Sequence, residues 1–546
     1  MALKVAFFAR SLAIVSLVLA ACSSSGGGAH VDGSPDRGSA GVDGGGSGGS
    51  SAGNDGGGPG GGAGVDSGGP DGGAAGVDGG NPDGDAEDVD DGNPDGDGGG
   101  PDGGNADVDV AGDATEALDA GWKAYAAVPQ APPTSYTCAS EIHVATTGDD
   151  TGGDGTSGMP YKTIGKGIAM ATAAGACVQV HAGTYTPAAT LTFPSDGTAG
   201  NPIVLRSADG RGMAIIDGSA VTAAPTVEVN KDHVVIDGFE FKNKPQSDGA
   251  FVVRFDGQSI SKCEGSVLRN SKLTGGFSQL KIYQKTHGVV IENNEFSGPT
   301  ANSTASLTGA SGLLFRANYL HDIDTGDLGT TELVGGSTGA TFEKNLFQDI
   351  STASGALVFG DACGATCDND PEHYAAVNAL AWSNIFIRVR RALDILGCKN
   401  CSVLSNTIID AGVNAGYVFR IGSANTNGVV QPTTGLRIID NLLASPSALM
   451  GYVMDLGASS STGLNMDYNL FYDGPAGLAF GATHPATADT HSVLGDPLFV
   501  GPTDLRPGAG SPAIGAGTNL VSDVPQDFLN VTRPASGAFD IGAVQH

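Results

Sequence analysis

A run of carboxylates in the middle of the chain has the residue types of a calcium site. Asp322, Asp324 and Asp327 stand in the stretch HDIDTGD, and Glu332 follows shortly after it. Calcium prefers several oxygen ligands, which a loop rich in carboxylates can supply. The four residues are therefore predicted to bind Ca²⁺. The alternative is a solvated acidic loop.

Four other charged residues could bind an acidic ligand or act on it. Asp394 and Arg420 are predicted to be catalytic, and Lys281 and Arg391 to bind substrate. A guanidinium group can make two parallel hydrogen bonds to a carboxylate, and the guanidinium group itself stays protonated. Arg420 is therefore expected first as a clamp, and as a base only if it is desolvated beside a metal. The alternative for each residue is ordinary surface charge.

A nine-residue repeat, which reads GVVIENNEF at Gly288–Phe296, marks the elements that must position these side chains. Its fourth and ninth residues are apolar in every copy, which predicts short strands with one buried face. The seventh residue is asparagine in seven copies: Asn294, Asn318, Asn345, Asn384, Asn406, Asn441 and Asn469. This asparagine is expected to turn the chain, because its amide can bond nearby backbone and it tolerates left-handed backbone angles.

The spacing of the copies predicts a stack of coils. The asparagines recur 22 to 39 residues apart, and a third strand that often ends in glycine precedes each copy. A unit of this length must bury its apolar face against copies of itself. Stacked asparagines, roughly 4.8 Å apart, would form a hydrogen-bonded ladder. The alternative is a two-sheet β-sandwich.

Three strands per coil, a ladder asparagine and variable loops resemble the right-handed parallel β-helix of pectate lyases, over roughly residues 140–480. The resemblance implies an all-β solenoid with a polysaccharide lying along one sheet, towards which Lys281, Glu332, Asp394 and Arg420 point. It also implies an eliminase acting on a uronate polymer. The active-site motifs of the calcium-dependent lyases and of the pectin hydrolases are missing, and aromatic residues make up only 6% of the chain. The sequence therefore leaves catalysis open.

The chain divides into three parts by composition. Residues 1–21 have the layout of a signal peptide, and Leu19 to Cys22 resemble a bacterial lipobox, which implies a lipid on Cys22. The alternative is an uncleaved signal anchor. Residues 22–120 are rich in Gly and Asp and are predicted to be a disordered tether. Residues 121–546 are predicted to form the β-helix, with a helix within 160–174 at one end and a C-terminal capping segment.

Eight cysteines are present, so seven remain beside Cys22, and one of these is unpaired or links two chains. Cys138 and Cys177 flank the predicted capping helix and could be bonded across it. Four others are expected to be neighbours in space: Cys363, Cys367, Cys398 and Cys401. Two disulfides are favoured for them over a four-thiolate zinc site. Cys263 is predicted to lie too far from this group to join it.

Two functions of different classes follow. The first is a lipid-anchored enzyme of the outer membrane that cleaves an acidic polysaccharide. The second is a non-catalytic surface module that binds glycan or acts as an adhesin or spacer. In both, the expected partners are a polysaccharide and, through the lipid, a membrane. We expect a monomer with no nucleic-acid partner.

Overall fold

The structure is a computed structural model that describes residues 136–257, 263–298, 300–324, 329–352, 354–412, 417–447, 452–456, 461–474 and 490–546. The predicted signal peptide and tether, with Cys22, lie outside these residues. Within the described segments, no helix has the length and apolar character needed to cross a membrane.

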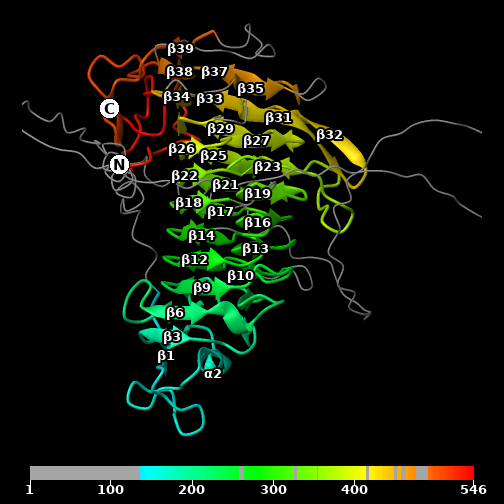
Figure 1. The fold of residues 1–546 in the computed structure, drawn as a ribbon, viewed down its shortest axis with the longest axis vertical. Helices are drawn as coiled ribbons and strands as arrows, with labels where there is room; N and C mark the ends of the chain where they lie inside the picture. The colour runs from blue at the N-terminus through cyan, green and yellow to red at the C-terminus, as the bar shows by residue number, and fades with distance from the viewer. Residues whose placement is uncertain are drawn as a thin grey trace, which may run out of the picture. The chain divides into compact units, whose positions relative to one another are not determined.

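The described residues coil through three parallel sheets (Figure 1). The first sheet contains β1 (Ser140–Val144), β2 (Ala176–Val180), β5 (Ile203–Ser207), β8 (Val234–Asp237), β11 (Val267–Arg269), β14 (Val290–Glu292), β17 (Leu314–Arg316), β21 (Thr341–Glu343), β25 (Leu380–Trp382), β29 (Ser402–Leu404), β33 (Arg437–Ile439) and β37 (Asn465–Asp467). The second contains β3 (Gly183–Tyr185), β6 (Ala214–Asp217), β9 (Glu240–Lys244), β12 (Lys272–Gly275), β15 (Glu295–Ser297), β18 (Tyr319–Ile323), β22 (Leu346–Ile350), β26 (Ile385–Val389), β30 (Thr407–Ile409), β34 (Leu442–Ala444), β38 (Leu470–Tyr472) and β39 (Val493–Leu494). The third contains β4 (Leu191–Thr192), β7 (Val227–Val229), β10 (Val253–Phe255), β13 (Leu280–Ile282), β16 (Ala305–Thr308), β19 (Thr331–Val334), β23 (Leu357–Phe359), β27 (Leu393–Leu396), β31 (Tyr417–Thr426) and β35 (Tyr452–Leu456).

Short strands at the corner between the third and first sheets complete several coils: β20 (Ser337–Thr338), β24 (Ala376–Val377), β28 (Cys398–Lys399), β32 (Val429–Thr434) and β36 (Ser461–Thr462). The strand β32 also folds back on β31 as an antiparallel hairpin. Another small hairpin joins β40 (Phe499–Gly501) to β41 (Asp504–Pro507). All other strand pairs in the described segments are parallel, so the predicted all-β parallel β-helix is confirmed.

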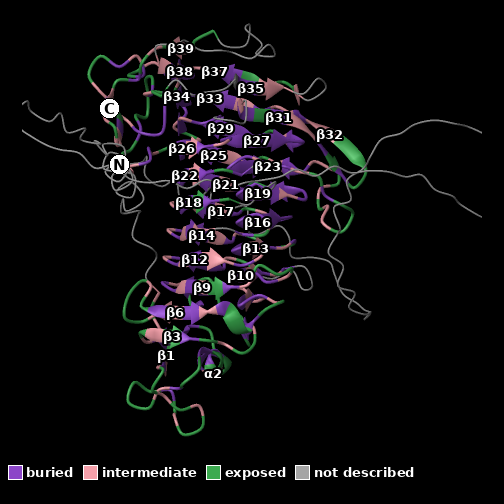
Figure 2. Cartoon of the chain, in the orientation of Figure 1, coloured by how far each residue is buried: buried purple, intermediate pink, exposed green. Residues whose placement is uncertain are grey.

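Buried residues run through the strands of the three sheets (Figure 2). The core lies between the sheets, since alternate residues of a strand face opposite sides. The fourth repeat residues Phe315 and Phe342 lie with ring centres 5.6 Å apart and ring planes tilted by 39°. The ninth repeat residues Phe347 and Phe386 are parallel at 4.7 Å. All four side chains are fully buried, as the repeat predicts.

The asparagine ladder is continuous. In each of its six steps, Nδ2 of one asparagine donates to Oδ1 of the next at 2.9–3.1 Å. Serines end it on both sides: Ser271 donates its backbone N–H to Asn294, and Ser492 accepts from the backbone N–H of Asn469. The expected backbone bonds of the amide are present, as from Asn406 Nδ2 to the Leu404 carbonyl at 3.1 Å. The expected left-handed angles at the asparagine were wrong, because the preceding residue has the positive φ, 54° at Asn293 and 53° at Ala317.

The helix α2 (Ile164–Met170) packs on the first strands, as predicted, and buries Ile164 and Ile168. Cys138 and Cys177 form the predicted disulfide beside it. Of the four cysteines expected to be neighbours, Cys363 bonds to Cys367 and Cys398 to Cys401, so the prediction of two disulfides is confirmed. Among the described cysteines, Cys263 is the free one, and it is buried.

The C-terminal segment does more than close the last coil. Residues 496–546, here called the C-terminal strap, run back along the sides of the later coils (Figure 1). Lys344 Nζ donates to Gln526 Oε1 at 2.9 Å, and Arg437 pairs with Asp523 at 3.0 Å. Apolar strap residues cover apolar strand residues of the first two sheets: Leu505, Ala513, Leu520, Val524, Phe528, Phe539, Ile541, Ala543 and Val544.

Candidate functional site

The outer face of the third sheet carries a row of mostly charged and polar residues, here called the third-sheet row. Successive strands place its members opposite one another: Glu228, Arg254, Lys281, Ser306, Glu332, Val358, Asp394, Arg420 and Asp455. Four of the predicted site residues, Lys281, Glu332, Asp394 and Arg420, therefore share one face. Their side chains separate into two clusters.

The first cluster surrounds Lys281, which is half-buried. Its Nζ donates to Ser306 Oγ at 2.8 Å and to Thr308 Oγ1 at 3.0 Å, and it lies 4.9 Å from the centre of the Tyr283 ring. Burial lowers the pKa of Lys281 to about 8, while the Glu332 carboxylate opposes the shift. A substantial fraction of Lys281 is therefore neutral at mildly alkaline pH, which is what a general base requires.

Arg254 lies opposite Lys281 on the adjacent strand β10. A guanidinium group is a permanent cation in proteins. Arg254 Nη2 lies 2.9 Å from Glu228 and 3.7 Å from Asp256. Its guanidinium carbon is 5.8 Å from the centre of the Tyr283 ring. The first cluster thus combines a fixed cation with an amine that can lose its proton.

The second cluster is built on Asp394, whose side chain is only 1% exposed. Arg391 Nη1 donates to both carboxylate oxygens, at 2.9 and 3.0 Å, and Arg420 Nη1 lies 3.8 Å from Oδ2. Burial raises the pKa of Asp394, and Arg391 and Arg420 oppose that shift. The geometry favours Asp394 as the group that holds the two guanidinium groups, of which Arg420 is 47% exposed.

The two clusters are too far apart to act on one bond. Three strands, β16, β19 and β23, separate Lys281 from Asp394. Four strand spacings correspond to roughly 19 Å. A polymer lying along the sheet could touch both clusters, but one sugar could not.

The predicted calcium residues do not converge where the structure describes them. Asp322 belongs to β18 of the second sheet, and its carboxylate lies 2.6 Å from His321 Nδ1. Glu332 belongs to the third sheet and accepts from the Gly329 N–H at 3.0 Å. Asp324 follows β18, and Asp327 lies outside the described residues. In the described part of the chain, no three His, Cys, Asp or Glu side chains form a metal-binding group. Calcium binding therefore stays a prediction.

Sequence reasoning missed the side chains that surround Lys281. Ser306 and Thr308 lie on β16, and Tyr283 follows β13. A signal was available, because Tyr283 is two residues after Lys281 and alternation places both on one face. The hydroxyl groups of the next coil could be assigned only once the register of the strands was known.

Comparisons with known proteins find one matching family and one short match to a curated protein. Residues 146–326 match a family described as a protein of unknown function (DUF1565). Pectate lyase PEL9 of Emericella nidulans is 36% identical to this chain over 87 residues, 16% of this chain and 20% of that protein. The chain therefore aligns with only a fifth of the length of that curated relative.

Two solved structures are similar at low sequence identity. Pectate lyase Pel9A has a TM-score of 0.45 and 15% identity, over 76% of this chain and 98% of that one. A rhamnogalacturonan lyase has a TM-score of 0.40 and 15% identity, over 60% of this chain and 87% of that one. The strand pairing described above establishes the parallel β-helix in its own right.

Proposed function

We propose that the third-sheet row binds an acidic polysaccharide and that Lys281 cleaves it by β-elimination. The observation that carries this proposal is the half-buried Lys281, with its pKa lowered to about 8, beside the permanent cation of Arg254. The partial sequence likeness to a pectate lyase supports the same chemistry.

The reaction needs two functions that the Lys281 cluster supplies. A uronate carboxylate paired with Arg254 makes the proton on the adjacent sugar carbon more acidic. The neutral Lys281 Nζ takes this proton, the electron pair forms a carbon–carbon double bond, and the neighbouring carbon–oxygen bond breaks. The leaving oxygen takes a proton from water. The product carries an unsaturated sugar at its new end.

The test exposes the purified chain to a panel of uronate polysaccharides and records the absorbance of the new double bond. kcat/KM should rise with pH up to about 8 and then level off, because the neutral amine is the active form. Lys281→Arg keeps the cation but cannot lose its proton, and should reduce kcat/KM by at least about 100-fold. Lys162→Arg, at an exposed site near α2, is the matched control. Equal activity of wild type and Lys281→Arg would refute the role of Lys281.

A non-catalytic glycan-binding module is the second candidate, and the ion pairs of the row favour it. Arg254 is paired with Glu228, and Arg391 with Asp394. Paired charges of this kind also suit a stable binding surface. Saturable binding of a polysaccharide that yields no unsaturated product, over the whole pH range, would select this function.

We also propose that the protein is a lipoprotein of the outer membrane, displayed on a tether. The lipobox-like sequence ending at Cys22 and the Gly/Asp-rich residues 22–120 support this proposal. A surface location would place the third-sheet row near polymers too large to enter the cell.

A further inference from the structure

Three glycines on the side of the β-helix, Gly309, Gly335 and Gly336, lie directly under one long loop. The loop, residues 361–374, leaves the coil after β23 and lies on the corner where the third sheet ends. A Cβ at Gly309 would collide with Asn369 Nδ2, and one at Gly335 with the Cys367 carbonyl oxygen. A Cβ at Gly336 would collide with the backbone of the same loop. The glycines that follow the third-sheet strands β16 and β19 therefore make room for this loop.

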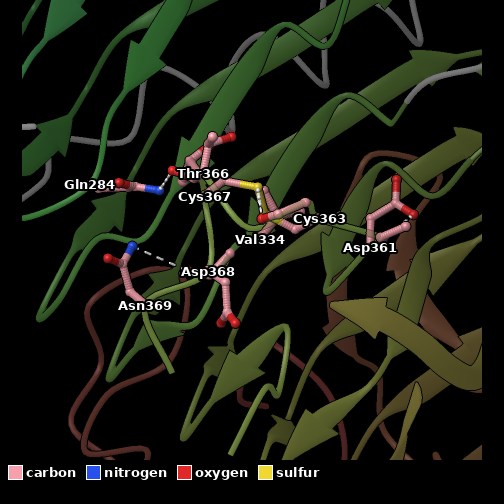
Figure 3. The surroundings of a disulfide bond; sticks show 12 residues. Gln284, Val334, Asp361, Cys363, Thr366, Cys367, Asp368 and Asn369 are labelled. Atoms are coloured by element: carbon pink, nitrogen blue, oxygen red, sulfur yellow. Dashed lines mark hydrogen bonds between the residues drawn. A yellow bond between two sulfur atoms is a disulfide. The ribbon is translucent and has the colours of Figure 1, made fainter. Parts of the chain in front are cut away.

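The loop reaches back to the coil that carries Lys281 (Figure 3). Gln284 Nε2 donates to the Thr366 carbonyl, and Asn369 donates its backbone N–H to the Gly335 carbonyl at 3.2 Å. Gln284 is buried and stands three residues after Lys281. The loop is thus fixed to β13 and its neighbours, although it comes from a coil three strands away in the third sheet.

The loop also borders the hydroxyl partner of Lys281. Thr308 Oγ1 accepts from Lys281 Nζ, and the next residue is Gly309, over which Asn369 lies. The Thr308 methyl group is 3.0 Å from the position of a Cβ at Gly335. Displacement of the loop would therefore loosen the surroundings of Lys281 from the side of β16.

At its other side, the loop is fastened to the strand that carries Arg420. The backbone N–H of Cys363 donates to Asn425 at 3.0 Å, and Asn427 donates to the Cys363 carbonyl at 2.7 Å. Both asparagines belong to the β31–β32 hairpin, and Arg420 lies on β31. The Cys363–Cys367 disulfide closes the segment between the two attachments (Figure 3). One loop, which contains this disulfide, thus contacts both the coil that carries Lys281 and the strand that carries Arg420.

We propose that the disulfide-closed loop of residues 361–374 is a positioning element of the candidate site, which fixes the surroundings of Lys281 and ties them to the Arg420 strand. Its effect on catalysis rests on the proposed function, whereas its effect on Lys281 can be measured without any substrate. Gln284, Gly335 and the two cysteines act through Lys281 and touch no substrate.

The test measures how fast Lys281 is acylated as a function of pH, by mass spectrometry of the full chain labelled with an isotopic acetylating reagent. Exposed Lys285 in the same region is the internal reference. The double variant Cys363→Ser/Cys367→Ser should move the labelling midpoint of Lys281 upward from about 8, towards the ordinary lysine value of about 10.4. Gln284→Ala, which leaves the disulfide intact, should raise the labelling midpoint of Lys281 by a smaller amount. Cys138→Ser/Cys177→Ser, which opens the disulfide near α2, should lower the melting temperature without moving the midpoint.

The outcomes separate this inference from the proposed function. A shifted Lys281 midpoint, together with a kcat/KM profile displaced to higher pH, supports both. A shifted midpoint with no activity on any polymer supports the positioning role and refutes the lyase. An unchanged midpoint in a folded Cys363→Ser/Cys367→Ser variant, or an equal shift in the Cys138→Ser/Cys177→Ser control, overturns the positioning role.

Discussion

At the scale of single residues, the ladder asparagines do what few other side chains can. An amide both donates and accepts, so identical residues can bond to one another along a stack. Asn345 donates to Asn384 and to the Phe315 carbonyl, and its Oδ1 accepts two hydrogen bonds from Asn318. All of these groups are buried, so each depends on the ladder rather than on water.

Asn345→Ala should therefore lower the free energy of unfolding by at least about 3 kcal/mol, because it leaves two donors of Asn318 and the Phe315 carbonyl without a partner. Urea denaturation followed by circular dichroism measures the loss. Asn201→Ala, at an exposed asparagine of a loop, should change it by less than about 0.5 kcal/mol. Equal effects of the two substitutions would show that the ladder adds little stability.

The carboxylates around Asp324 provide a second test at this scale. If this loop binds calcium, added Ca²⁺ raises the melting temperature of the wild type, and Asp324→Asn/Asp327→Asn removes that rise with little change in metal-free melting. A rise of equal size in both proteins, or in neither, would exclude the loop as a metal site. Asp410→Asn, at a carboxylate bonded to Ser445, is a suitable control.

At the scale of elements, the outer face of the first sheet shows how register is specified. One row alternates in charge from strand to strand: Asp237, Arg269, Glu292, Arg316 and Glu343. Arg269 lies 2.9 Å from Asp237, and Arg316 lies 2.6 Å from Glu292. Moving a strand by one residue would remove its charge from the row, since alternate residues face opposite sides. The row therefore favours the observed pairing.

Glu292→Arg would stack three guanidinium groups on neighbouring strands and should destabilise the protein by about 3 kcal/mol. The loss should shrink as salt is added, because ions screen the repulsion. Glu264→Arg makes the same change at an exposed site and should have little effect. A loss of stability that is independent of salt would mean that packing, rather than charge, sets the cost.

The strands, their inward faces and the ladder could be predicted, because the repeat places apolar residues and asparagines at fixed positions. The first repeat residue also carries a signal: it has positive φ at Gly288 and Gly312, where glycine meets no steric penalty. The sixth repeat residue carries no such signal, because residues as different as Asn293, Ala317 and Lys344 all adopt left-handed backbone angles there. The loop of residues 361–374 was not predictable either, because its contacts join coils that are distant in sequence.

At the scale of the whole molecule, the sequence predicts attachment through Cys22. Cys22→Ala should leave the protein without lipid, so that it appears in the periplasm or the medium, while its melting stays that of the wild type. Detergent phase partitioning of cells that express each form provides the measurement. Cys263→Ala, at a buried thiol of the β-helix, controls for loss of a cysteine. Unchanged partitioning of Cys22→Ala would exclude the lipid anchor.

The C-terminal strap explains why the outer face of the first sheet changes from charged to apolar residues along the stack. In the first sheet, the charged row continues into Trp382, Leu404 and Ile439, and these apolar residues pack against Leu520 and Phe539 of the strap. Burial of such side chains stabilises a protein by about 1.5–3 kcal/mol each. The strap is therefore part of the folded unit, and the apolar end of the row marks where it lies.

Arg533 provides a way to test how the strap is held. Its side chain is 1% exposed, donates to the Gly542 carbonyl at 2.7 Å and lies 5.1 Å from the centre of the Phe539 ring. Arg533→Ala should free the Phe539 segment and uncover Trp382. The chain has two tryptophans, so in a Trp122→Phe background the fluorescence comes from Trp382 alone. Acrylamide should quench this fluorescence more strongly after Arg533→Ala than after Val531→Ala, at an exposed strap position. Equal quenching in the two variants would mean that apolar contacts hold the strap without Arg533.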